Sequence, residues 1–133
     1  MTAIADSSGL ISLFVKSDSN YSSALKVKQS LEKKSGKIYV SSEVFSETIN
    51  IFGKKFGHEK ATKAARVILS LKSFIFVDSD DDIRLAALKY FEKSPTSVSY
   101  TDCMVMAFAD HFETKIILGF DEAFIKNGYK LPE

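Results

Sequence analysis

The sequence predicts an α/β fold in which helices cover both faces of a mostly parallel sheet. Short apolar stretches alternate with longer segments of helical periodicity along the whole chain, and this alternation is typical of parallel sheets. With 133 residues, the chain has the usual size of one domain. We therefore expect a single domain over residues 1–133, with a substantial core because 45% of the residues are hydrophobic.

Four apolar stretches are the predicted strands, and a fifth candidate lies near the C-terminus. They cover residues 2–6, 37–41, 73–77, 115–118 and 129–131. We therefore expect four to five strands in the sheet. In open sheets of this class, ligands bind beyond the carboxyl ends of the strands. Acidic residues that follow a strand are thus the first candidates for a functional site.

Seven helices are predicted between and after these strands. They cover residues 9–16, 20–34, 42–52, 58–72, 83–92, a segment opened by Ser99, and 122–126. Gly36 is expected to end the second helix, and Gly53 and Gly57 to separate the third helix from the fourth. Ser99 and Asp102 have the Ser-x-x-Asp spacing of a capping box.

The charge and cysteine content limit the classes of function. The 18 Lys and Arg residues nearly balance the 17 Asp and Glu residues, whereas a protein that holds nucleic acid by net charge alone is usually far more basic. Nucleic-acid binding would therefore need segregated charges. The single cysteine, Cys103, permits no intrachain disulfide, and we see neither a signal peptide nor a membrane-spanning segment. We expect a soluble protein of the reducing cytoplasm.

Two acids follow predicted strands. Asp6 ends the first and most apolar strand, which is usually central in such folds, so its carboxylate is costly to desolvate without a partner. Asp121 lies three residues beyond the fourth strand. Each of them could simply cap a helix. For Asp6 we favour a functional role, because Asp121 is a second acid at a strand end.

Two further acids lie on predicted helices. Asp102 is in the first turn of an otherwise apolar helix, where free amides and the helix dipole stabilise a carboxylate, although a capping box alone would also place an acid there. Glu47 shares a polar stripe with Glu43 on the third helix, and periodicity alone favours a solvated face for this stripe. The four candidate acids are thus Asp6, Glu47, Asp102 and Asp121.

A pocket that gathers several carboxylates needs cations, because like charges in one site cannot all stay ionised unaided. Oxygen ligands without a Cys/His cluster favour Mg²⁺ or Mn²⁺ over zinc. The two histidines, His58 and His111, lack metal-ligand spacing and are expected at the surface. Acid clusters of this kind serve metal-assisted phosphoryl transfer. The sequence alone leaves open whether the four acids meet.

Four segments of the chain carry a resemblance to a known family. They are IADSSGLISLF with Asp6, YVSSEVFSETINIF with Glu47, SYTDCMVMAFADHF with Asp102, and ILGFDEAFIKNGYKLP with Asp121. Together they resemble the motifs of PIN-domain ribonucleases, in the style of the VapC toxins of type II toxin–antitoxin pairs. The resemblance covers nearly the whole chain. Each motif is weak alone, whereas all four in order are fairly specific.

This resemblance implies a three-layer α/β/α fold and an endoribonuclease that cleaves single-stranded RNA with Mg²⁺ or Mn²⁺. Ser8 and Thr101 would be supporting hydroxyls, and the implied partners are a cognate antitoxin and a second copy of the chain. The implied catalytic residues and metal ligands are Asp6, Glu47, Asp102 and Asp121. Five basic residues could follow the RNA backbone, although a solvated helix face is the simpler explanation for each: Lys54, Lys55, Lys60, Lys63 and Arg66.

Two other functions stay open. Gly119 stands two residues before the last aspartate, where the family usually has Thr or Ser. The chain could therefore be a catalytically weakened PIN fold that serves as a module binding RNA or protein. The acidic run from Asp78 to Asp82 suggests the phosphoacceptor of a receiver-like signalling domain. Such a domain has paired acids after its first strand, however, where this chain has only Asp6, and helix capping explains the run better.

Overall fold

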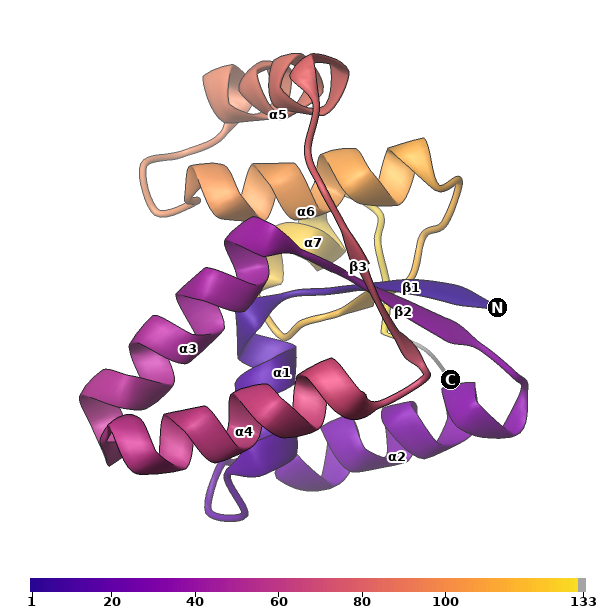
Figure 1. Ribbon diagram of the computed structural model, residues 1–133. Helices are drawn as coiled ribbons and strands as arrows, with labels where there is room; N and C mark the ends of the chain where they lie inside the picture. The colour runs from indigo at the N-terminus through magenta and orange to yellow at the C-terminus, as the bar shows by residue number, and fades with distance from the viewer. Residues whose placement is uncertain (132–133) are drawn as a thin grey trace.

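Four parallel strands form the centre of the protein, for which a computed structural model describes residues 1–131 (Figure 1). The strands are β1 (Thr2–Ala5), β2 (Lys37–Ser41), β3 (Phe74–Val77) and β4 (Ile117–Leu118). Their order is β3-β2-β1-β4, and each pairing is parallel. The mostly parallel sheet is therefore confirmed, and β1 is one of its two central strands, as expected for the most apolar strand.

Within residues 1–131, seven helices surround the sheet. They are α1 (Ser7–Phe14), α2 (Tyr21–Lys33), α3 (Ser42–Phe56), α4 (His58–Ser70), α5 (Asp81–Lys93), α6 (Tyr100–His111) and α7 (Glu122–Lys126). In Figure 1, α5, α6 and α7 lie on one side of the sheet, and α1, α2 and α4 lie on the other. This arrangement confirms the three-layer α/β/α fold. Within residues 1–131, no helix combines the length and apolar character that a bilayer span requires.

Helix α6 is buried between the sheet and α5, which is the outermost helix of its layer (Figure 1). Its residues 103–109 are all buried, as a helix needs when neighbours cover every face. They share one core with Ile4 of β1 and Val40 of β2. Each fully buried aliphatic side chain contributes about 1.5–3 kcal/mol to stability, so this core holds the start of α6 firmly beside the ends of the strands.

Polar side chains cap the helices that begin at or near the strand ends, and each accepts a hydrogen bond from a free backbone N–H of its helix. The capping residues are Asp6, Ser41, Asp80, Ser99 and Asp121. The cap at Asp80 supports the explanation of the acidic run as helix capping. The positive ends of α1, α3, α5 and α7 follow the carboxyl ends of the strands, so this edge of the sheet attracts acids.

The structure differs from two local predictions. Helix α3 continues through Gly53 to Phe56, and only Gly57, with φ +91°, ends it. Helix α2 ends at Lys33, before Gly36 as expected, and the turn between them places Ser35 in the left-handed region at φ +53°. The predicted fifth strand is reduced to one bridge between Ile116 and Lys130, and β4 itself has only two residues.

Candidate site at the carboxyl edge of the sheet

The chain brings three of the four candidate acids to the carboxyl edge of the sheet. Asp6 follows β1 directly, and its N–H donates to the carbonyl of Leu118 at the end of β4, at 2.9 Å. Asp121 lies just beyond that strand. The charge of Asp102 acts on Asp6, and the charge of Asp121 acts on Asp102. These three residues form what we call the aspartate cluster.

Asp6 is the most deeply buried member of the aspartate cluster, with a relative exposure of 3%. Its Oδ2 accepts a hydrogen bond of 2.9 Å from the Ser8 hydroxyl and one of 3.4 Å from the Ser8 N–H. Its Oδ1 is buried and has no hydrogen-bond partner within residues 1–131. Burial raises the pKa of Asp6 to about 6, the Ser8 hydroxyl opposes this rise, and the charge of Asp102 adds to it. A buried acceptor without a partner costs free energy, so this oxygen is suited to serve as the ligand of a cation.

Ser8 connects the loops that follow β1 and β4. Its hydroxyl donates to Asp6 and accepts a hydrogen bond of 3.0 Å from the N–H of Phe120. Gly119 is the first residue after β4, and a Cβ atom at this position would stand only 2.7 Å from the Cβ of Asp6. A side chain at this position would therefore displace the carboxylate. The glycine that departs from the family pattern is thus required by the close approach to Asp6, and the hydroxyl in contact with Asp6 comes from Ser8.

Asp102 is half-buried in the first turn of α6 and forms the capping box predicted from the sequence. Its Oδ2 accepts from the N–H of Ser99 at 3.1 Å, and its own N–H donates to the Ser99 hydroxyl at 3.1 Å. Burial raises the pKa of Asp102, the hydrogen bonds with Ser99 oppose this rise, and the charge of Asp121 adds to it. The capping box uses only Oδ2 of Asp102, so Oδ1 takes no part in the cap.

Asp121 is an exposed helix cap. Its Oδ1 accepts a hydrogen bond of 2.9 Å from the N–H of Ala123 at the start of α7. The cap role that the sequence allowed is therefore present. It does not exclude a second role, because a carboxylate has two oxygens and several acceptor positions.

Glu47 and Thr101 are less closely tied to this edge. Glu47 is half-buried on α3, and within residues 1–131 it makes no hydrogen bond or ion pair with the aspartate cluster. Thr101 is half-buried beside Asp102 in the first turn of α6. As the side chains stand in the described part of the chain, no group of three or more His, Cys, Asp or Glu residues is close enough together to hold a metal ion. Both histidines are exposed, as expected.

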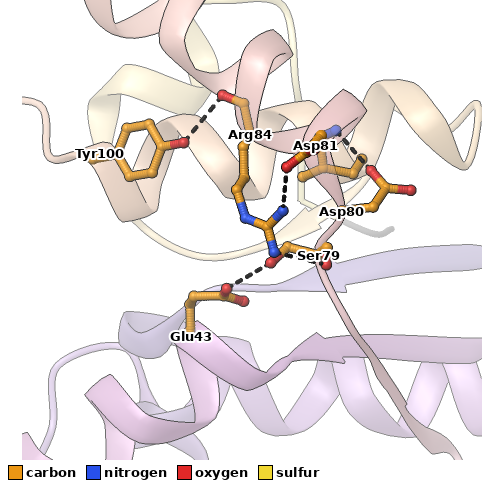
Figure 2. A network of polar contacts seen from close by, with 7 residues as sticks. Glu43, Ser79, Asp80, Asp81, Arg84 and Tyr100 are labelled. Atoms are coloured by element: carbon orange, nitrogen blue, oxygen red, sulfur yellow. Dashed lines mark hydrogen bonds and ion pairs between the residues drawn. The ribbon is translucent and has the colours of Figure 1, made fainter.

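A polar network that the sequence analysis missed lies next to this edge, at the start of α3 and α5 (Figure 2). Glu43 accepts a hydrogen bond of 2.8 Å from the Ser79 hydroxyl through Oε2, whereas its Oε1 is buried without a partner in residues 1–131. Arg84 donates to the carbonyl of Ser79 at 3.3 Å and to Asp81 at 2.8 Å. The solvated face predicted for the stripe on α3 is therefore wrong for Glu43. Its place two residues beyond a predicted strand was the signal that could have identified it.

The five predicted RNA-contacting residues are exposed, and they lie on α3 and α4. Two of them, Lys60 and Lys63, line an apolar groove of about 510 Å³ with Phe14 and Phe56. None of the five lines the larger cavity, of about 1150 Å³, that Asp121 borders. The basic residues of that cavity were not recognised from the sequence: they are Lys89, Lys93 and Lys126.

Comparisons with known proteins agree with this architecture. Among solved structures, the chain is similar to VapC20 of Mycobacterium tuberculosis, a sarcin–ricin loop cleaving toxin, with a TM-score of 0.84 and 19% identity over 98% of this chain and 97% of that chain. It is also similar to VapBC2 of Rickettsia felis, bound to a DNA fragment from their promoter, with a TM-score of 0.72 and 15% identity over 100% of this chain and 98% of that chain. At these identities the likeness concerns the fold. A search of curated protein sequences found no match.

The sequence also matches the PIN domain over residues 3–128, which include all four candidate acids. This match and the parallel α/β/α architecture confirm the resemblance inferred from the four motifs, and they leave the receiver-like interpretation without support. The chain therefore belongs to the PIN domain family.

Proposed function

We propose that the protein is an endoribonuclease that cleaves single-stranded RNA by hydrolysis assisted by Mg²⁺ or Mn²⁺. The observation that carries the proposal is the buried Oδ1 of Asp6, which has no hydrogen-bond partner in the described part of the chain and is exposed to the charge of Asp102. Two carboxylates that share a largely buried site disfavour each other's ionised form, and a divalent cation would relieve this conflict. Nuclease chemistry is also the reported activity of VapC20, the structural relative named above.

The donor set of the aspartate cluster fits a hard cation, because it consists of oxygen atoms without thiolate or imidazole. Asp6 and Asp102 would hold the principal ion, Glu47 would support it, and Asp121 would help to recruit a second ion or the attacking water. Without a cation, mutual repulsion keeps such carboxylates apart, which is consistent with their separation as the side chains stand. A bound divalent cation would activate water and stabilise the charge that develops on the phosphate.

The protein's own groups would hold the reacting centre in a fixed geometry. Ser8 fixes one oxygen of Asp6, and Ser99 fixes one oxygen of Asp102, so the remaining oxygens are oriented before substrate binds. Asp121 is the exposed acid of the cluster, and its free oxygen can accept a proton from water. Pre-oriented groups of this kind lower the barrier because little reorganisation remains for the reaction step.

The same proposal makes the chain the toxin of a toxin–antitoxin pair. The apolar groove between the ends of α1, α3 and α4 is lined by Phe14, Phe52 and Phe56 and has Lys60 and Lys63 among its residues. An amphipathic antitoxin segment with acidic residues beside its apolar face would match this surface. The apolar side chains of Leu88 and Phe91 on α5 are 45% exposed and provide a surface for a homodimer.

Cleavage of mixed cellular RNA tests the nuclease proposal. We expect the native chain to cleave RNA with Mg²⁺ and to lose this activity with EDTA. Asp6→Asn should be inactive, since the amide cannot supply a charged ligand. Asp78→Asn is the matched control, because Asp78 is also an acid after a strand but is exposed and only accepts a hydrogen bond from Ser42. Equal cleavage by the native chain and Asp6→Asn would indicate a contaminant or another mechanism.

A further inference from the structure

A cavity of about 1150 Å³ lies beside the aspartate cluster, between α5, α6 and α7. Asp121 lines it together with residues from the whole length of α5. A nuclease that acts on a chain substrate must hold the nucleotides next to the bond it breaks. The cavity shares Asp121 with the cluster, so a strand bound at the cluster has direct access to it.

Charge is segregated along the two helices that form the walls of this cavity. The acidic residues Asp82 and Glu122 lie in the first turns of α5 and α7, whereas lysines lie toward the ends of these helices: they are Lys89, Lys93 and Lys126. Both helices start from loops that follow strands at the carboxyl edge. The acids of these two helices thus lie nearer the aspartate cluster than their lysines do. A further acid of the lining, Asp110 in the last turn of α6, accepts hydrogen bonds from the hydroxyls of Tyr90 and Tyr129. The lysines of α5 and α7 therefore form the part of the cavity suited to phosphates.

The lysines of α5 are available for a ligand. Lys89 and Lys93 are four residues apart, lie on one face of α5 and make no ion pair within residues 1–131. Lys126 has only an exposed contact of 3.7 Å with Glu122, and exposed pairs of this kind contribute little. Two ammonium groups spaced by one helical turn can contact successive phosphates of a flexible strand.

The cavity also contains an aromatic side chain held in a fixed position. The Tyr90 hydroxyl hydrogen-bonds to Asp110 and, at 2.8 Å, to the hydroxyl of Tyr129. Its polar atom is thus engaged, while the side chain still lines the cavity next to Pro95 and Val98. Fixed aromatic surfaces beside lysines are the usual means of binding unstacked bases without selecting their sequence.

We propose that the cavity between α5, α6 and α7 binds the segment of single-stranded RNA next to the scissile phosphate, with Lys89 and Lys93 on its phosphates and Tyr90 beneath a base. This inference rests on the proposed nuclease function and gives it a substrate path. It also places the RNA-binding surface on the lysines of α5 rather than on the basic residues of α3 and α4, which were the candidates from the sequence.

The test compares two double variants with the same loss of charge, Lys89→Gln/Lys93→Gln and Lys60→Gln/Lys63→Gln. A short fluorescent single-stranded RNA is titrated in EDTA, so that binding is measured without cleavage. We expect the α5 variant to bind on the order of tenfold more weakly and to lower the slope of log K against log salt by about 1.4, since each phosphate contact in a single strand contributes about 0.7. Thermal melting of both variants verifies that they fold.

Cleavage with Mg²⁺ provides the second readout. The α5 variant should raise KM while kcat stays close to that of the native chain, and its rise in KM should be several times that of the α4 variant. Equal weakening by both pairs, or native binding by the α5 variant, would overturn the assignment of the groove. A native chain that binds RNA through α5 but does not cleave it would instead refute the nuclease proposal, so the two failures are distinguishable.

Discussion

At the scale of single residues, the burial of Asp6 dominates the site and makes the stability of the cation-free protein depend on pH. Its pKa is raised from 3.8 to about 6, so the folded chain holds this proton more tightly than the unfolded chain does. Stability is therefore highest below pH 3.8, as far as this group is concerned, and falls as the pH rises from there to about 6. Above about pH 6 the free energy of unfolding no longer falls, and the total loss from this group is about 3 kcal/mol.

Asp6→Asn should remove this loss, because its amide stays neutral at every pH. In EDTA, urea unfolding at pH 7.5 should give the variant a free energy of unfolding greater than that of the native chain by up to about 3 kcal/mol, and the difference should shrink toward zero as the pH approaches 3.8. Asp78→Asn, at an exposed position, should change the stability by less than about 0.5 kcal/mol. A difference for Asp6→Asn that does not vary with pH would contradict the assigned pKa.

Gly119 is the second residue on which the site depends, and Gly119→Ala tests its close contact with Asp6. The added Cβ would lie 2.7 Å from the Cβ of Asp6 and 2.9 Å from Cε2 of Phe124, so we expect overpacking to cost about 1–3 kcal/mol and RNA cleavage to fall. The matched control is Gly53→Ala within α3, where the nearest atom is Cδ2 of His58 at 3.2 Å. There the higher helix propensity of Ala should stabilise by up to about 1 kcal/mol, and melting of both variants compares the two effects.

At the scale of elements, the capping chemistry could be predicted and the lengths of the elements could not. The spacing of Ser99 and Asp102 alone predicts their capping box, because the interaction joins residues three apart in the sequence. Gly53 looked like a helix end, yet α3 continues past it, because packing against α4 outweighs a propensity penalty of about 1 kcal/mol. The contact of Glu43 could not be predicted either, because its partner Ser79 follows another strand and is distant in the sequence.

A tyrosine–aspartate cluster fixes α5 to α6 and to the C-terminal segment. The hydroxyl of Tyr129 donates to Asp110 at 2.6 Å and also lies 2.8 Å from the hydroxyl of Tyr90. Tyr129→Phe should lower the free energy of unfolding by about 1–2 kcal/mol, since it removes the buried hydroxyl and leaves the other members without this partner. Tyr21→Phe, at a half-buried position on α2, is the control and should be nearly neutral. Equal urea midpoints for both variants would show that this cluster does not stabilise the fold.

At the scale of the whole molecule, the sequence predicted that Asp6 and Asp121 lie at one edge of the sheet but not the surface that surrounds them. Asp6 and Asp121 could be paired because parallel strands end at the same edge of a sheet. The cavity lined by Lys89 and Lys126 could not be foreseen, because α5 and α7 are far apart in the chain and face each other only after α6 has packed between the sheet and α5. A sequence pattern reveals the periodicity of one helix, but it does not show which helices line the same cavity.

Cation binding should stabilise the whole fold, because the aspartate cluster joins the end of β1, the start of α6 and the loop after β4. A ligand that binds only the folded state adds about 2.7 kcal/mol to stability at 100 times its dissociation constant. We therefore expect Mg²⁺ to raise the melting temperature of the native chain and of Asp78→Asn, measured against EDTA at equal ionic strength.

Asp6→Asn and Asp102→Asn should lose this Mg²⁺-dependent increase, although they start from different stabilities. Asp6→Asn begins higher, because a buried charge is removed, whereas Asp102→Asn begins closer to the native chain, because Asp102 is only half-buried and the amide oxygen can still accept the hydrogen bond from the N–H of Ser99. The increase on adding Mg²⁺, rather than the starting stability, thus reports cation binding. If all four proteins responded equally to Mg²⁺, the ion would act on the general surface charge, and the three aspartates would have to be explained as helix caps and buried acids alone.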